Sequence, residues 1–252
     1  MNRLGWIHAP ERSRLLWDRL TTLAAAARAD GFDRTLVCGM GGSSLTPEVL
    51  AATAGGRGGT DGGGALRVLD STDPAAVLAA RRGGELARTL FLIISKSGTT
   101  IETLAFYHYF AALVRPNQFV AVTGAGTPLE TLARARGFRD VLEHPGDVGG
   151  RYAALTVVGM LPAALLGLDG RALLQRTRAV DVARAKAFGA ALADAALAGR
   201  DKLVLRPPPA LAALAPWIEQ LIAESSGKDG RGVVPVVDDP VGAPLHDAEV
   251  VT

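Results

Sequence analysis

The sequence lacks the features of secreted and membrane proteins. A single cysteine, Cys38, among 252 residues excludes an intrachain disulfide framework. Its setting in residues 35–39 suits a small buried side chain on a strand, with a reactive thiol as the alternative. The N-terminus has no apolar signal core, and the longest apolar stretch, residues 155–168, is interrupted by Pro162 and is shorter than a membrane span. We therefore expect a soluble, cytoplasmic protein with no membrane contact.

The sequence also lacks an excess of charge of either sign. It has 27 basic and 25 acidic residues, a net charge of +2, and no basic block. Nucleic-acid binding therefore has no electrostatic basis, although a local anion site for a phosphorylated small molecule remains compatible. Hydrophobic residues make up 48% and charged residues 21% of the chain, a balance typical of globular proteins and not of disordered ones.

Short apolar runs alternate with helical patterns along the first half of the chain. After a helix over residues 11–29, the expected strands cover residues 36–38, 66–69, 90–94, 119–123 and 141–142. The expected helices cover residues 47–54, 74 onward, about 101–113 and 128–136, the second and fourth opened by Asp73-Pro74 and Thr127-Pro128. This alternation predicts an α/β fold with a parallel sheet covered on both faces. Ligands should bind in the loops after Cys38, Ile94 and Thr123.

The second half of the chain predicts a smaller, incomplete unit. Residues 156–200 have an alanine-rich pattern consistent with two bridging helices. Strands at residues 202–205 and 233–237 then flank a helix near residues 217–224. One helix between two strands cannot bury both faces of a sheet, so this unit should lean on the first domain, another chain or further sequence. The glycine-rich residues 55–64 predict a flexible surface linker in preference to a phosphate cradle, because no helix starts directly after them.

The first polar cluster follows the strand expected at residues 36–38. Residues 39–47 contain three glycines followed by Ser43 and Ser44, and they lead into a helix. Glycines let the backbone approach an anion closely, and a helix N-terminus supplies N–H groups and a favourable dipole. The spacing matches neither a dinucleotide fingerprint nor a Walker loop. The cluster indicates an anion site, with a plain strand-to-helix turn as the alternative.

The second polar cluster follows the strand expected at residues 90–94. It packs four hydroxyls and one ammonium group into six residues: Ser95, Lys96, Ser97, Thr99 and Thr100. Such a group of donors suits a phosphate monoester. Thr99 or Thr100 is also placed to cap the next helix, with Glu102 completing a capping arrangement. Capping does not account for Lys96, so the cluster favours phosphate binding.

Two further clusters carry a cation and a carboxylate. Gly149 and Gly150 precede Arg151, and such a constrained loop aims a guanidinium that can stabilise an oxyanion or hold a phosphate; an ordinary surface arginine is the alternative. A helix starting near Pro216 puts Gln220 and Glu224 one turn apart on the same face. Glu224 suits a general base, with a solvated helix-end glutamate as the alternative.

Together these clusters resemble the glucose-6-phosphate isomerase family, whose domains have the sugar-isomerase (SIS) fold. The resemblance spans about residues 30–240 and is nearest to the variant fused behind a transaldolase in some bacteria. Residues 70–74 look like one of the family's strand ends. The other matching residues, in the family's order, are Gly41, Gly42, Ser43, Ser95, Lys96, Ser97, Thr99, Thr100, Glu102, Thr103, Gly149, Gly150, Arg151, Tyr152, Glu224, Ser225, Gly227 and Lys228.

The resemblance implies a fold and a reaction. The fold would be a three-layer αβα SIS domain with a parallel sheet over residues 31–175, preceded by a helical segment at residues 1–30. Bridging helices and a partial second SIS domain would follow at residues 176–252. The reaction would interconvert glucose 6-phosphate and fructose 6-phosphate through an enediolate, as in glycolysis and gluconeogenesis, without a metal or other cofactor. A homodimer is the implied assembly.

The resemblance also implies residue roles. Ser95, Ser97, Thr99 and Thr100, with the backbone around Lys96, would bind the phosphate. Gly42 and Ser43 would contact the sugar. Arg151 would stabilise the enediolate, and Glu224 would carry the proton between C2 and C1 with Gln220 close by.

The family's ring-opening histidine and C-terminal lysine have no matching motif. His246 lacks the flanking residues and is interpreted as a surface histidine, and His8, His108 and His144 have no matching context. We therefore expect a C-terminally shortened chain, completed by a missing half or a transaldolase-type partner and not necessarily active alone. The alternative is a non-catalytic SIS module that binds a sugar phosphate as a sensor. Glu224 and Gln220 favour the enzyme, since a sensor needs no base beside C2.

Overall fold

The computed structural model describes residues 4–54, 65–82, 85–237 and 248–251. The expectations for the glycine-rich residues 55–64 and for His246 lie outside these described residues. The chain divides into two compact units, Met1–Thr177 and Arg178–Thr252, each of which is described by itself.

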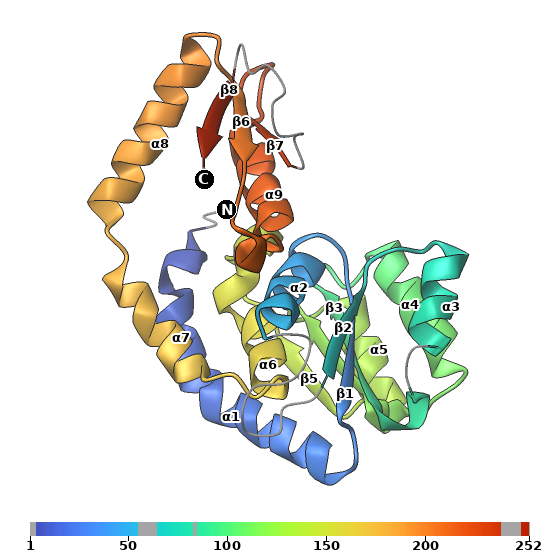
Figure 1. The fold of residues 1–252 in the computed structure, drawn as a ribbon. Helices are drawn as coiled ribbons and strands as arrows, with labels where there is room; N and C mark the ends of the chain where they lie inside the picture. The colour runs from blue at the N-terminus through green and yellow to red at the C-terminus, as the bar shows by residue number, and fades with distance from the viewer. Residues whose placement is uncertain (1–3, 55–64, 83–84, 238–247, 252) are drawn as a thin grey trace. The chain divides into compact units, whose positions relative to one another are not determined.

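A five-stranded parallel sheet forms the centre of the first unit (Figure 1). Its strands are β1 (Arg34–Cys38), β2 (Ala65–Leu69), β3 (Thr89–Ser95), β4 (Phe119–Thr123) and β5 (Asp140–Glu143), in the order β2-β1-β3-β4-β5. All neighbouring strands are parallel, and Cys38 lies opposite Ile93 across the β1–β3 pair. The parallel sheet predicted from the alternating pattern is therefore confirmed, with each strand within two residues of its expected bounds.

Helices cover both faces of this sheet. One face carries α1 (Ala9–Ala29), α2 (Gly42–Thr53), α6 (Val157–Leu165) and α7 (Gly170–Arg176), and the other carries α3 (Pro74–Arg82), α4 (Ile101–Ala111) and α5 (Pro128–Arg136). Alternate strand residues enter opposite cores: Val37 packs with the first set and Cys38 with the second. The predicted three-layer arrangement is confirmed, and the single cysteine is fully buried at the end of β1.

Two helix assignments differ from the expectation. Helix α2 begins at Gly42, five residues before Pro47, because Gly41 adopts φ 56° and turns the chain directly into the helix. Residues 156–200 form three α-helices where two were expected: α6, α7 and α8 (Val182–Leu197). The additional breaks come at the side chains of Asp169 and Asp181, which cap α7 and α8 by accepting hydrogen bonds from backbone N–H groups.

Short 3-10 segments connect these elements. They are η1 (Gly5–His8), η2 (Leu86–Arg88), η3 (Pro116–Gln118), η4 (Gly150–Leu155), η5 (Thr177–Ala179) and η6 (Pro209–Leu211). Segments η1 and η4 contact one another, which brings the start of the described chain to the glycine-arginine loop.

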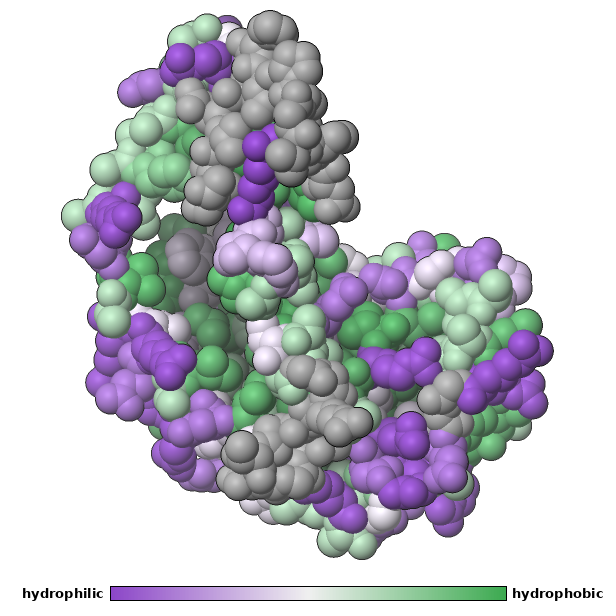
Figure 2. Space-filling view, viewed as in Figure 1, coloured by the Kyte–Doolittle hydropathy of each residue, from purple (hydrophilic) through white to green (hydrophobic). Residues whose placement is uncertain are grey.

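The second unit has a three-stranded parallel sheet in the order β7-β6-β8. Its elements are α8, β6 (Lys202–Leu205), α9 (Leu214–Ser226), β7 (Val234–Val236) and β8 (Ala248–Val251). Strand β8 was not predicted, so the expectation of a two-stranded unit is wrong. The core is small, with Leu203, Leu205 and Ala215 buried. Helix α8 exposes Val182, Phe188 and Leu197, and the space-filling view shows green residues along it (Figure 2).

Candidate functional site

The site expected from the topology lies where β1 and β3 end. In the order β2-β1-β3-β4-β5, the chain leaves β1 toward one edge of the sheet and returns to pair β3 on its other side. The loops after β1 and β3 therefore diverge to opposite faces, the arrangement in which α/β folds bind ligands at the carboxyl ends of the strands. These are the loops that hold Gly42 and Ser43 and residues 95–100.

The hydroxyl groups of residues 95–100 form two local pairs. The Oγ of Ser95 is buried, lies 2.8 Å from Oγ1 of Thr100 and accepts a hydrogen bond from the Gly98 N–H at 3.1 Å. The exposed Thr99 hydroxyl donates to Oγ of Ser97 at 2.9 Å, and the Thr99 N–H also donates to that Oγ. One pair thus holds the loop from inside while the other faces solvent, where an anion can reach it.

The first turn of α4 is not capped by Thr100. Thr100 occupies the N-cap position, but its side chain accepts no hydrogen bond from the helix because it pairs with Ser95. Of the two capping candidates, Thr99 and Thr100, the one at the N-cap position is Thr100, and the expectation that its side chain caps the helix is wrong. A helix start without a side-chain cap retains N–H groups and a positive dipole end that favour an anion.

The ammonium group of Lys96 reaches across to another loop. It donates hydrogen bonds to the carbonyl oxygens of Gly146 at 2.9 Å and Val148 at 2.5 Å. The Lys96 carbonyl accepts from the Gly124 N–H at 3.0 Å, which ties its backbone to the loop after β4. Helix capping does not account for Lys96, and the structure shows that its side chain instead makes contacts with another loop of the first unit.

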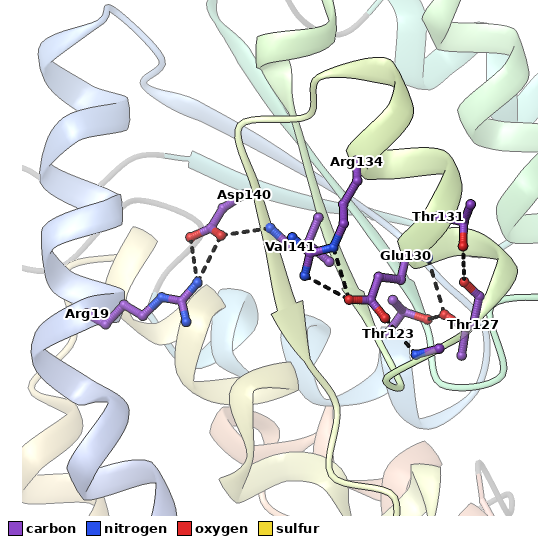
Figure 3. A network of polar contacts seen from close by, with 9 residues as sticks. Arg19, Thr123, Thr127, Glu130, Thr131, Arg134, Asp140 and Val141 are labelled. Carbon is purple, nitrogen blue, oxygen red and sulfur yellow. Dashed lines mark hydrogen bonds and ion pairs between the residues drawn. The ribbon is translucent and has the colours of Figure 1, made fainter.

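The β4–α5 corner, whose polar contacts are drawn in Figure 3, lies against the loop of residues 95–100 through Thr127. Thr127 caps α5 by accepting from the Glu130 N–H at 3.3 Å, as its position before Pro128 predicts, and its hydroxyl pairs with that of Thr123 at 2.8 Å. Gly98 lies against Thr127: a Cβ on Gly98 would come within 2.7 Å of the Thr127 Cβ. With φ +67°, Gly98 also has a left-handed conformation that a side chain would strain.

The structure brings Gly42 against the loop that carries Arg151. A Cβ on Gly42 would lie 2.2 Å from the Gly150 oxygen and 2.8 Å from the Arg151 nitrogen. Only a glycine permits this approach of the α2 N-terminus to η4, and it links two clusters more than a hundred residues apart in sequence. Ser43, the next residue, is half-buried.

Arg151 is half-buried and lies over an aromatic ring. Its Cζ is 4.8 Å from the centroid of the Tyr152 ring, and Trp6 stacks with Tyr152 at 5.4 Å between centroids. A guanidinium over an aromatic face is held electrostatically and sterically. Trp6 was not predicted as part of this region, and its apolar N-terminal setting gave no periodic pattern from which to infer it.

Two other residues near this loop, His144 and Arg12, belong to none of the polar clusters found in the sequence. His144 is buried at the end of β5, with its Nδ1 3.0 Å from the Pro145 oxygen. Burial lowers the pKa of the His144 imidazole, and the positive charge of Lys96 acts in the same direction. Arg12 on α1 forms a bidentate ion pair with Asp147 at 2.8 and 2.9 Å, and this contact holds the pKa of the Asp147 carboxyl below its usual range. The sequence signal for this loop is the motif of Gly149, Gly150 and Arg151, which includes neither His144 nor Arg12.

In the second unit, Gln220 and Glu224 lie on one face of α9 as the spacing predicts. The Gln220 Nε2 donates to the Glu224 Oε1 at 2.9 Å, and Glu224 is exposed. The helix begins at Leu214, two residues before the expected Pro216. Contacts therefore link the Gly42 turn to the Arg151 loop and Lys96 to residues 146–148, and they link Gln220 to Glu224.

The described residues contain neither a candidate metal-binding cluster nor a candidate membrane-spanning helix. Among them no group of three or more histidines, cysteines, aspartates or glutamates is arranged to hold a metal ion. No helix in the described part of the chain has the length and apolar character needed to cross a membrane.

Comparison with known proteins gives a consistent result. No protein-family model matches the chain. The sequence is similar to the glucose-6-phosphate isomerase of Geobacter sp. strain M21, with 33% identity over 262 aligned positions covering 89% of this chain and 48% of that protein. It is also similar to the glucose-6-phosphate isomerase of Symbiobacterium thermophilum, with 34% identity covering 92% of this chain and 57% of that protein. The chain spans about half the length of the curated relatives it matches.

Solved structures agree with the sequence comparison. A hypothetical protein of Thermus thermophilus superposes with a TM-score of 0.82 and 26% identity, covering 98% of this chain and 65% of that chain. A glucose-6-phosphate isomerase from Chlamydia trachomatis gives a TM-score of 0.72 at 24% identity, covering 90% of this chain and 49% of that chain. The SIS fold expected from the motifs is therefore confirmed.

Proposed function

Because the chain belongs to the glucose-6-phosphate isomerase family over the part that it spans, we propose that it binds a sugar phosphate and carries the proton-transfer chemistry of an aldose–ketose isomerase. The substrates are glucose 6-phosphate and fructose 6-phosphate. The proposed roles are phosphate binding by residues 95–100, charge stabilisation by Arg151 and proton transfer by Glu224.

The phosphate is held by the loop of residues 95–100. Ser97 and Thr99 present exposed hydroxyls, while Ser95 and Thr100 fix the loop and add their own hydroxyls. The first-turn N–H groups of α4 complete the group of donors, since Thr100 does not cap them. The Lys96 backbone forms part of this loop, and Gly42 and Ser43 contact the sugar.

Arg151 and Glu224 carry out the chemical step. Glu224 removes the proton from C2 of the open-chain aldose and returns it to C1, and the hydroxyl proton passes from O2 to O1. Arg151 stabilises the oxyanion of the enediolate between the two carbon proton transfers. Gln220, bonded to Glu224, orients the carboxylate. The reaction is an internal redox exchange between C1 and C2, so one base, one cation and exclusion of water suffice.

The observation that carries the proposal is the contact of Gly42 with the backbone of Gly150 and Arg151 in a chain related to glucose-6-phosphate isomerases. The alternative, a turn that only links a strand to a helix, does not account for the contact of Gly42 with a loop more than a hundred residues away. The contact puts the proposed sugar-facing turn next to the backbone that carries Arg151, which supports a shared role for the two clusters.

The first experiment measures phosphate recognition. Calorimetry with glucose 6-phosphate, inorganic phosphate and unphosphorylated glucose should show binding of the first two only. Replacing both Ser97 and Thr99 by Ala should weaken glucose 6-phosphate binding about tenfold or more, because hydrogen bonds to a charged group are lost. The control is Thr131→Ala, an exposed threonine on α5 that bonds only its own helix, and it should leave binding unchanged. Equal binding of glucose and glucose 6-phosphate would contradict the proposal.

The second experiment tests the base. In deuterated water the chain should exchange the C2 hydrogen of glucose 6-phosphate for deuterium, which proton NMR detects without requiring complete turnover. Glu224→Gln should slow this exchange by at least ~100-fold. The matched control is Glu219→Gln, a change at an exposed glutamate on the same helix, which should have no effect. Retained binding with no exchange in the unmodified chain would favour the sensor over the enzyme.

The assembly and domain organisation are also proposed. We expect a homodimer, as in the family, and a first SIS domain at residues 31–175 followed by part of a second. Light scattering at micromolar concentration gives the mass of the assembly directly, and a monomer mass would contradict the dimer.

A further inference from the structure

Lys96 is the residue whose contacts join the proposed phosphate loop to the loop before Arg151. Its backbone lies within residues 95–100, where its carbonyl accepts from Gly124. Its ammonium group, at the far end of the side chain, binds the Gly146 and Val148 carbonyls. The segment that it binds continues without a break into Gly149, Gly150 and Arg151.

The same segment is held from its other side by the N-terminal residues. Arg12 forms its bidentate ion pair with the Asp147 side chain, and the Gly5 N–H donates to the Asp147 carbonyl at 3.2 Å. Leu4 pairs with Val148 in an antiparallel bridge. The Lys96 ammonium thus links residues 146–148 directly to the phosphate loop.

The charges around the ammonium group agree with this role. Its field contributes to lowering the pKa of both His144 and Asp147, so it lies close to each. His144 is buried and its lowered pKa keeps the imidazole neutral at neutral pH, which avoids a second cation beside the ammonium. The ammonium is thus surrounded by acceptors of the Arg151 loop.

We propose that Lys96 is a positioning residue that couples the phosphate loop to the orientation of Arg151. It acts through residues 146–148 and not by direct contact with the phosphate. When phosphate orders residues 95–100, the Lys96 side chain transmits that order to Gly150 and Arg151, and the cation is then set where negative charge develops. The coupling to Arg151 rests on the proposed function, whereas the tie between the two loops does not.

A ligand-free measurement tests the tie itself. In Lys96→Met, which keeps the side-chain length and removes the donors, hydrogen exchange of residues 145–152 should become about tenfold faster or more. Lys96→Arg should restore slow exchange in part, because a cation with donors remains. The control is Lys202→Met, a change at a half-buried lysine of the second unit. Unchanged exchange at residues 145–152 in Lys96→Met would overturn the proposal.

A ligand-binding measurement tests the coupling. Inorganic phosphate should bind Lys96→Met within about twofold of the unmodified chain, whereas a five-carbon aldonate 5-phosphate, whose carboxylate mimics the enediolate, should bind about tenfold more weakly or worse. An equal loss for both ligands would make Lys96 a direct phosphate ligand and overturn the proposal, as would no loss for either. Failure of the unmodified chain to bind any sugar phosphate would instead refute the proposed function, while the exchange result would still decide the tie.

Discussion

The close approach of Gly42 to the arginine loop leads to a quantitative prediction for Gly42→Ala. The new Cβ would stand 2.2 Å from the Gly150 oxygen and 2.4 Å from the Gly150 carbon. An atom at 2.2 Å must move by about 1.3 Å to reach the ~3.5 Å of an ordinary contact. Both opposing atoms belong to the backbone, so no side chain can rotate away to make room.

The expected cost follows from two opposing effects. Forcing a methyl group into a packed site costs about 1–3 kcal/mol, and the upper part of that range applies because backbone must shift. Replacing glycine by alanine reduces the entropy of the unfolded chain and returns about 0.4–1 kcal/mol. The net loss of stability should be about 2 kcal/mol, a fall in melting temperature of about 4–8 °C for a chain of this size.

The single cysteine supplies the assay. Cys38 is fully buried in β1 of the same unit, and burial raises the pKa of its thiol, so a thiol reagent reaches it only when this unit opens. A loss of 2 kcal/mol should speed labelling by about 30-fold. The matched control is Gly146→Ala, since a Cβ there meets nothing within 4 Å. Equal labelling rates in the two variants would refute the argument from the Gly42 contact.

Two further predictions concern a buried imidazole and a helix cap. The lowered pKa of His144 means that the unfolded chain takes up this proton first, so stability should be lost as pH falls below the ordinary histidine value of 6.5. Urea unfolding at about pH 7.5 and about pH 5.5 should show a smaller loss in His144→Gln, and an equal loss would contradict the assignment. Thr127→Ala removes the α5 cap and should cost about 1 kcal/mol in the same urea titration at neutral pH. Thr131→Ala, one turn later, should cost much less.

Local chemistry explains why much of the first unit was predictable. Strand β4 was expected at residues 119–123, its observed bounds, because an all-buried strand in a covered parallel sheet reads as an unbroken apolar run. Helix α3 starts where Asp73 precedes Pro74, and the Asp73 carboxylate accepts from the Ala75 and Ala76 N–H groups. Each of these signals depends on a few neighbouring residues, so it can be read from the sequence alone.

The failures share a different cause. Strand β8 was missed because it is four residues long and pairs with β6 more than forty residues earlier, so its stability comes from a partner and not from its own pattern. Thr99 or Thr100 was expected to cap α4, but the hydroxyl of Thr100 at the N-cap pairs with the buried Ser95. The contacts of Trp6 and Arg12 with the Arg151 loop join residues more than a hundred positions apart. No spacing rule reaches that far.

The sequence by itself determined the α/β class, the positions of the first unit's strands along the chain and the residues of the polar clusters, because periodicity and helix-start chemistry are local. It also determined the family, through motifs whose order is fixed along the chain. Only the tertiary structure decided how the clusters of the first unit meet: Gly42 presses on the Gly150–Arg151 backbone, and the Lys96 ammonium binds the loop before Arg151. The Lys96 ammonium can reach these carbonyl acceptors only when the sheet has brought its loops to one edge, so the role of Lys96 depends on the fold.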